Sequence, residues 1–203
     1  MDDSLSRDAR LALDLALTVR HDGHGGVADD LAESTGLTAW VRAHPDVLPG
    51  SEAYVADDPA LIAVRDLRTA VRALFARAVR PAEPSPADAD ADAARLLPVP
   101  EAIARLNAAA ARTPTVPVLA WPDDADPVVR QEPQSGRPEL TAVLAGAAIA
   151  FLASPDRQRL RACHAPRCVR YFLKEHPRQE WCKASCGNRA RVARHHERHK
   201  KSA

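Results

Sequence analysis

All four cysteines of this 203-residue chain lie in one stretch, residues 163–186, which reads "CHAPRCVRYFLKEHPRQEWCKASC". They form two pairs, C-x4-C and C-x3-C, with thirteen residues between the pairs. Zinc takes four soft ligands in a tetrahedron, and two close pairs joined by a turn supply them. We therefore predict one structural zinc ion held by Cys163, Cys168, Cys182 and Cys186, in a treble-clef-like finger whose spacer is a hairpin turning at residues 174–179.

Two alternatives to a zinc ion bound by four cysteines follow from the same residues. Free or redox-active thiols are the first, but neither pair has the two-residue spacing of a dithiol oxidoreductase. Clustered cysteines in a reducing cytosol also favour metal over disulfides. In the second, His164, His176 or His195 replaces a cysteine. Four cysteines already close the coordination shell and leave no position for a catalytic water, so the zinc is expected to be structural.

The acidic and basic residues are divided between two parts of the chain. Residues 1–156 carry 14 Lys and Arg against 24 Asp and Glu, whereas residues 157–203 carry 14 against 3 and five of the eight histidines. Such a division is typical of a basic module that meets a polyanion. The alternative is a basic tail that folds onto the acidic body.

The residues after Ser185 predict a basic helix that contacts nucleic acid. Arg191, Arg194 and Arg198 fall at i, i+3 and i+7, on one face of that helix. Arginine suits bidentate contacts with phosphate or guanine. The predicted nucleic-acid contacts are Arg189, Arg191, Arg194, Arg198 and Lys200. A basic face that is merely solvated is the alternative.

The two residues after Cys186 have a predicted structural role. Gly187 permits a tight backbone, and Asn188 caps or braces the metal knuckle, because a residue beside a metal ligand usually supports that ligand. Base reading by Asn188 is the alternative. Phe172 and Trp181 are expected in the small core of the finger.

The clearest element of the body is a helix over residues 58–80. Asp58 is its expected cap, Pro59 its first helical residue and Pro81 its stop. Its apolar residues recur at steps of three and four, which is typical of a helix that faces a core.

The other elements predict a fold that is mainly α-helical with one small β-hairpin. Further helices are expected at 4–20 (with strand as the alternative), 38–44, 100–112, 137–154 and 157–162. The hairpin is expected from residues 115–121 and 127–133. Loops are expected at residues 21–26 and 81–94.

The body offers little support for an enzyme. Its polar candidates are Asp14, His21, His24 and His44, and the loop "HDGHGG" (21–26) lacks the strand–turn–helix context of a phosphate-binding loop. We therefore expect no catalytic residues. There is no run of eighteen apolar residues and the N-terminus is polar and acidic, which predicts a soluble cytoplasmic protein without a membrane span.

The stretch "WCKASCGNRARVARHHERHK" (181–200), preceded by "RACHAPRCVRYF" (161–172), resembles the CGNR zinc finger. That finger closes a family of bacterial proteins whose N-terminal part is called the ABATE domain. The resemblance extends to "LALDLALTV" (11–19), "LNAAAAR" (106–112) and the hairpin before an alanine-rich helix. It implies an ABATE-like helical body at 1–156 and a CGNR-type finger at 157–203. It also implies a transcription regulator, often described as stress-related, whose finger binds DNA.

The sequence departs from the family pattern at two places. Leu17 stands where members carry an asparagine in the first helix, so a ligand-binding role of that asparagine does not carry over. Lys174, Glu175 and His176 stand where many members carry Asp and Ser after a hydrophobic strand.

These observations lead to the expectation of a DNA-binding transcription regulator associated with the nucleoid. The body is expected to form a homodimer or to bind a small molecule, and so to alter the docking of the finger. The main alternative is a protein-interaction module in which the basic finger docks an acidic partner, because one finger is a small footprint for DNA recognition. RNA binding ranks below both, since few aromatic residues are available to stack on unpaired bases.

Overall fold

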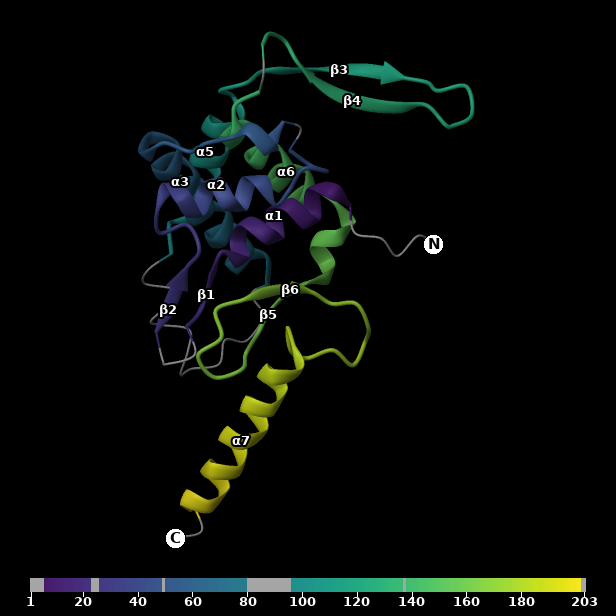
Figure 1. Cartoon of the computed structure of the whole chain (residues 1–203). Helices are drawn as coiled ribbons and strands as arrows, with labels where there is room; N and C mark the ends of the chain where they lie inside the picture. Colours follow the sequence, from purple (N-terminus) through teal and green to yellow (C-terminus); the bar gives the residue numbers. More distant parts are fainter. Residues whose placement is uncertain (1–5, 23–25, 49, 80–95, 137, 202–203) are drawn as a thin grey trace.

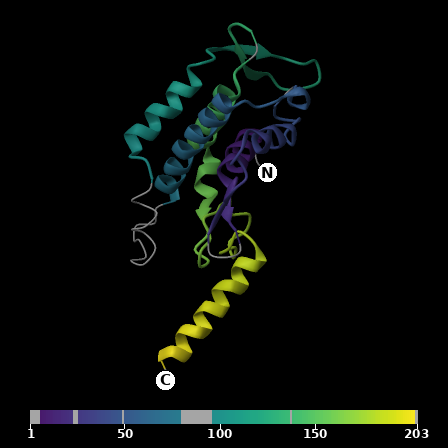
Figure 2. The same ribbon diagram turned by 60° about the vertical axis from the view of Figure 1, so that its left-hand side comes forward.

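The computed structural model describes residues 6–22, 26–48, 50–79, 96–136 and 138–201. The side chains of Glu197, Lys200 and Lys201 lie outside that description. A bundle of helices forms the body, and a small finger connects it to a long terminal helix that extends away from it (Figures 1 and 2). The predicted mainly α-helical class with a C-terminal zinc-finger arrangement is confirmed.

The body consists of five α-helices within the described residues. They are α1 Arg7–Leu17, α2 Ser34–Arg42, α3 Asp58–Val79, α5 Val99–Ala110 and α6 Leu140–Ala153, with 3-10 turns η1 Ser51–Ala53 and η2 Pro155–Arg159. Three antiparallel hairpins join them: β1 Val19–His21 with β2 Val27–Asp29, β3 Thr115–Ala120 with β4 Val128–Pro133, and β5 Leu160–Ala162 with β6 Tyr171–Leu173. The terminal helix is α7 Ala184–Lys201.

Local sequence explains the starts of α1 and α3. The hydroxyl of Ser6 accepts a hydrogen bond from the Ala9 N–H at 3.1 Å, which caps α1. Leu11 and Leu15 are buried one helical turn apart, so the helix expected at this position, rather than a strand, is present. In α3 the side chain of Asp57, not Asp58, accepts from the Ala60 N–H at 2.8 Å. The predicted cap was therefore one residue too late.

The core forms where α1, α3 and α6 meet. Phe75 of α3 and Phe151 of α6 are fully buried, and their rings meet edge to face with centroids 5.4 Å apart. Alanines of α6 (Ala145, Ala148) are also fully buried, and small side chains of this kind let neighbouring helices approach closely. The alanine-rich composition thus still yields a continuous core around few large anchors.

The hairpin β3–β4 matches the prediction and projects from the body at the end opposite α7 (Figure 1). Its apolar side chains remain exposed to solvent: Val116, Leu119, Trp121, Val128 and Val129. Trp121 is 70% exposed, which is unusual for a residue with so much apolar surface.

Two local expectations were wrong. The helix expected over residues 4–20 ends at Leu17, and residues 19–21, the last of them expected as the start of a loop, form strand β1, which pairs with residues 27–29. Residues 157–162, expected as a helix, form the end of η2 and strand β5 instead. In both cases the strands are three residues long, too short for an alternation of apolar and polar residues to be recognised. The expected loop at 81–94 lies outside the described residues.

An ion pair between buried Arg68 and half-buried Asp29 fixes the β1–β2 hairpin to the body. Arg68 of α3 donates two hydrogen bonds to the Asp29 carboxylate, at 2.5 and 2.7 Å, and one to the Thr18 hydroxyl at 2.9 Å. Burial by itself would raise the pKa of Asp29. The hydrogen bonds from Arg68 and the Leu31 N–H, with the charges of Arg68 and Arg65, instead hold that pKa below its usual value. The hairpin is thereby held beside the finger.

Candidate functional site

Strands β5 and β6 connect the finger to the body. Side chains alternate along β6: Tyr171 and Leu173 pack into the body core, whereas Phe172 points into the cluster that contains the cysteines. Arg72 of α3 reinforces the junction, since it donates to the Val169 carbonyl at 3.0 Å and accepts on its own carbonyl from the Tyr171 hydroxyl at 3.2 Å. The finger and the body therefore share packing across one short strand.

The first cysteine pair lies in the loop between β5 and β6. The Cys163 N–H donates to the Arg170 carbonyl at 2.9 Å, and the Cys168 N–H donates to the Ala165 carbonyl at 2.9 Å. Arg167, immediately before Cys168, adopts a left-handed backbone with φ of 63°, which tightens the turn.

The hairpin expected inside the spacer is therefore wrong, because β6 pairs back with β5 and the first cysteine loop is the turn. The physical reason is burial: Leu160, Tyr171 and Leu173 reach the body core only in this pairing.

The second cysteine pair lies at the start of α7. Cys186 falls in the first turn of the helix and is fully buried. Gly187 follows it, and a Cβ atom there would lie only 3.0 Å from Cδ1 of Trp181. Phe172 and Trp181 both pack into the finger's small cluster, as expected.

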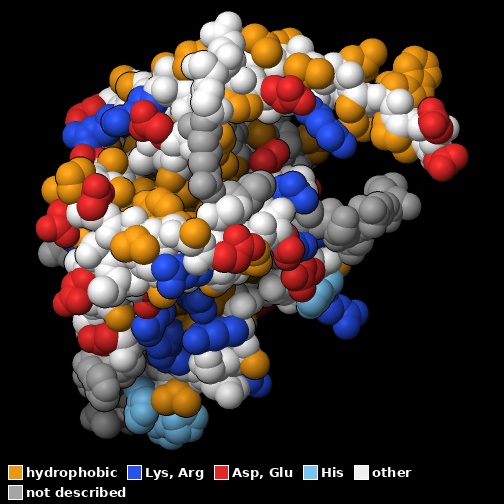
Figure 3. All heavy atoms as spheres, turned by 45° about the horizontal axis from the view of Figure 1, so that its top comes forward, with side chains coloured by type: hydrophobic (Ala, Val, Ile, Leu, Met, Phe, Trp, Pro, Cys, Tyr) orange, Lys and Arg blue, Asp and Glu red, His pale blue; other side chains and the backbone are white. Residues whose placement is uncertain are grey.

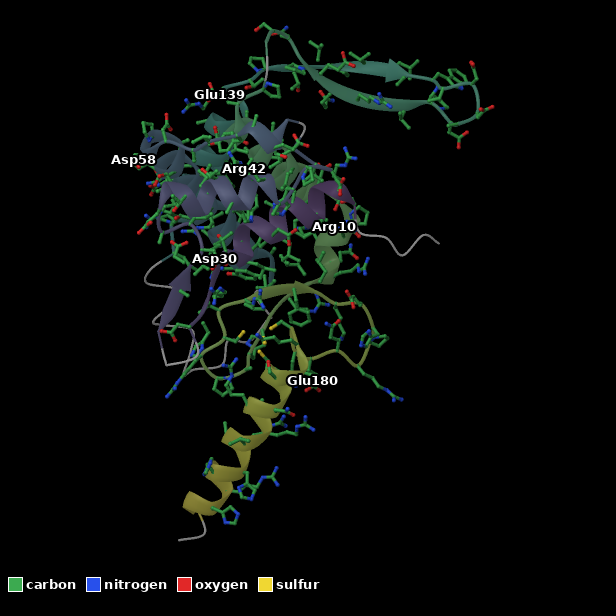
Figure 4. All side chains as sticks on the ribbon, viewed as in Figure 1. Arg10, Asp30, Arg42, Asp58, Glu139 and Glu180 are labelled. Atoms are coloured by element: carbon green, nitrogen blue, oxygen red, sulfur yellow. The ribbon has the colours of Figure 1, made fainter. Side chains whose placement is uncertain are left out.

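The four sulfur atoms lie within 4.8 Å of one another. The separations of Cys168–Cys182, Cys182–Cys186 and Cys168–Cys186 are 3.8, 3.5 and 3.8 Å. Four thiolates at a zinc–sulfur distance of about 2.3 Å form a tetrahedron with edges of roughly 3.8 Å. In Figure 4 the sulfur atoms gather between the β5–β6 hairpin and the start of α7. The four cysteines thus fit one structural zinc ion.

Crowding makes these thiols difficult to ionise together. Hydrogen bonds from Cys168 and Cys182 lower the pKa of Cys163, while the hydrogen bond to Cys163 raises the pKa of Cys168 to about 11 and also raises that of Cys182. A divalent cation removes this conflict, because it stabilises all four thiolates. The guanidinium of Arg189 adds a donor to the Cys186 sulfur at 3.2 Å.

The residues predicted to contact nucleic acid differ in how exposed they are. Arg191, Arg194 and Arg198 are exposed on α7, which extends away from the body (Figure 4). Arg189 is half-buried and turned toward Cys186. The side chain of Lys200 lies outside the described residues. Asn188 accepts a hydrogen bond from Arg191, so it braces the arginine face of the helix.

Arg20 and Arg170, which sequence reasoning did not single out, lie near this helix start. Both line a small cavity together with Lys183 and Arg189. No local signal could have identified them, because they come together only when β1, far away in sequence, packs beside the finger. Figure 3 shows Lys and Arg side chains gathered on one part of the surface, while hydrophobic side chains cover the projecting hairpin.

Of the polar candidates of the body that the structure describes, Asp14 and His44 form a pair. Both ring nitrogens of His44 face oxygen acceptors: the Trp40 carbonyl at 2.7 Å and the Asp14 carboxylate at 3.4 Å. An acceptor on each side favours the protonated ring, which donates through both nitrogens. His21 belongs to β1, and His24 lies outside the described residues. Among the described residues, no helix is long and apolar enough to span a membrane.

Comparison with known families matches both parts of the chain. Residues 9–155 match the ABATE family, described as "Putative stress-induced transcription regulator", and residues 159–199 match the CGNR zinc finger. Both descriptions are of regulator and zinc-finger types rather than of enzymes. A search of curated proteins finds no significant match. On the strength of these matches and the clustered cysteines, the chain belongs to the ABATE family and carries a CGNR zinc finger after that domain.

Proposed function

We propose that the protein regulates transcription by binding DNA through α7, with zinc held by Cys163, Cys168, Cys182 and Cys186. The observation that carries the proposal is an exposed arginine face on a helix that starts at the cysteine cluster and extends clear of the body. A helix of this kind can approach the phosphate backbone or enter the major groove without a clash between DNA and the body.

Support for the metal ligands comes from the sulfur geometry and from the sequence, which has no cysteine outside this cluster to form a disulfide with it. A finger this small gains most of its folding free energy from its metal. Zinc binding would fix the direction of α7, because Cys186 lies in its first turn. The protein would then act at the nucleoid in the cytoplasm, with residues 1–156 as the regulatory body and 157–203 as the finger.

A homodimer is part of the proposal, because one finger buries little surface on DNA and a monomer would bind weakly. The exposed apolar side chains of β3–β4 support this hairpin as the contact between two copies. Two fingers held in one dimer would also read two half-sites. A small-molecule ligand would act by changing how the two fingers are held.

The proposal is tested by binding of the zinc-loaded protein to a generic DNA duplex at low salt. Replacing Arg191, Arg194 and Arg198 by alanine is expected to weaken binding at least a hundredfold, since each charge-assisted contact contributes about 1.5–3 kcal/mol. The matched control replaces three exposed body arginines, Arg7, Arg10 and Arg130, by alanine and should leave the affinity almost unchanged.

An equal loss in both triple variants would mean that overall charge, rather than α7, attracts DNA. If the folded, zinc-loaded protein binds no DNA at low salt, the alternative gains support: a basic finger that docks an acidic protein surface. Exposed Val192, beside the arginines, would give such a partner an apolar contact.

A further inference from the structure

A small cavity lies between the body and the finger. Its volume is about 190 Å³, and its wall comes from β1, from the residues before β6 and from the start of α7. Three of the seven lining residues are Cys168 of the sulfur cluster, Ser185 and His21, and the other four are cationic: Arg20, Arg170, Lys183 and Arg189. Four cations from three separate segments therefore converge on a space of about six water molecules.

Hydrogen-bond donors in this wall lack acceptors. The Nε atoms of Arg170 and Arg189 are buried, and no described residue accepts a hydrogen bond from either. Arg189 uses one terminal nitrogen on the Cys186 sulfur, but that contact does not satisfy its Nε. A buried donor without an acceptor is costly, so an acceptor group in the cavity would be stabilised.

The charges of the neighbourhood do not fully cancel those of the cations. Asp30 pairs with Arg20 at 2.9 Å. A zinc ion with four thiolates would carry a net charge of −2, which offsets two of the remaining three cations. Among the described residues, no carboxylate forms an ion pair with Arg170 or Lys183. A positive charge is thus left facing a cavity whose buried donors have no acceptor.

We propose that this cavity binds a small phosphate-bearing anion. Guanidinium groups match phosphate oxygens with paired N–H donors, and Lys183 and Ser185 can complete the set. The start of the 18-residue helix α7 adds a favourable dipole for an anion. The space is large enough for a phosphate group and a few further atoms. Its position between body and finger favours a free small molecule over the backbone of a DNA duplex.

Such a ligand would connect the two parts of the chain. Arg20 belongs to the body hairpin, whereas Arg170, Lys183 and Arg189 belong to the finger. An anion that contacts both would hold α7 more firmly in its orientation. The binding itself does not depend on the DNA-binding role proposed above, so either proposal can fail without the other.

The test is titration of the full-length, zinc-loaded protein with inorganic phosphate, at constant ionic strength in chloride, followed by calorimetry or phosphorus NMR. We expect saturable binding at one site. Arg170→Gln and Lys183→Gln should each weaken it about tenfold or more, because each removes a charged donor. Arg178→Gln is the matched control: it removes one exposed positive charge from the same finger, at a residue that does not line the cavity.

Zinc content and circular dichroism establish whether each variant is folded. Lys183 is exposed, so its variant should fold and can supply the test if the Arg170 variant does not fold. Absence of saturable phosphate binding in the unaltered protein would overturn the proposal. So would an equal loss in all three variants, which would indicate diffuse attraction. If phosphate fails to bind but the Arg170 and Lys183 variants lose DNA affinity, the cavity belongs to a DNA phosphate and the small-anion proposal is wrong.

Discussion

At Gly187 the protein has almost no room for a side chain. A Cβ atom there would lie 3.0 Å from Cδ1 of Trp181, closer than ordinary van der Waals contact. Cys186 directly precedes this position, so any shift that relieves the clash also moves a sulfur atom of the cluster. The glycine is explained by close packing and needs no left-handed backbone.

Gly187→Ala should therefore weaken both the finger and its hold on zinc. We expect a destabilisation of about 1–3 kcal/mol from overpacking, measured as faster loss of zinc to a competing chelator. Gly146→Ala is the control with the opposite sign. An added Cβ at Gly146 meets nothing within 4 Å, so alanine should stabilise α6 by about 0.5–1 kcal/mol. Unchanged zinc retention in Gly187→Ala would contradict the packing explanation.

His44, just after the end of α2, contacts α1 through a hydrogen bond that depends on pH. Its hydrogen bond to Asp14 raises the pKa of His44, despite the opposing effect of burial. Because the folded pKa is raised, the stabilisation is fully present below the unfolded value of 6.5 and is lost as pH rises through the folded pKa.

Asp14→Asn should lower the pKa of His44 and flatten the pH dependence of stability above pH 6.5. The proton NMR titration of His44 measures the first effect, and urea unfolding at pH 5.5 and pH 8 measures the second. A His44 pKa that is the same in the variant would show that Asp14 is not the cause.

At the level of single elements, the sequence predicted structure best where the residues of one segment alone determine its conformation. The apolar steps in α3 indicated its length and its buried face, and the cysteine spacing indicated the sulfur cluster. The β5–β6 pairing was missed because a strand of three residues carries no recognisable pattern. The pairing is also stabilised by burial of Leu160 and Leu173 against the body, which is distant in the sequence. The β1–β2 hairpin was missed for a similar reason, since Asp29 is held by Arg68, 39 residues away.

The element β3–β4 supplies a test of the proposed homodimer. Replacing Trp121 and Val129 by serine should shift the protein toward the monomer, because both side chains are largely exposed and apolar. Sedimentation equilibrium of the two forms measures this shift. Ile62→Ser is the control, since Ile62 is 61% exposed and belongs to α3 rather than to the hairpin. An unaltered protein that is monomeric at all concentrations would end the dimer proposal.

Across the whole molecule, the finger is continuous with the body core. Tyr171 meets Phe75 edge to face with centroids 5.5 Å apart, and Phe75 in turn meets Phe151. The metal cluster lies on the other side of the same strand, through Phe172. Loss of zinc should therefore loosen the packing of β6 and destabilise the body core as well.

Removal of zinc by a chelator is expected to lower the thermal unfolding midpoint of the body as well as to unfold the finger. Near-ultraviolet circular dichroism, which reports the packing of Tyr171 and its neighbours, should change together with the far-ultraviolet signal. Re-addition of zinc should restore both. Two separate transitions, with the body unaffected by the chelator, would mean that the finger is an independent unit.

The central claim is that α7 meets the phosphates of DNA, and the most direct test is the salt dependence of DNA binding by the zinc-loaded protein. The logarithm of the affinity should fall linearly with the logarithm of salt concentration, by about 0.9 per phosphate neutralised. Alanine at Arg191, Arg194 and Arg198 should reduce that slope by about 2–3, as up to three contacts are lost. A slope that is the same in the triple variant would contradict the claim and remove α7 from the DNA interface.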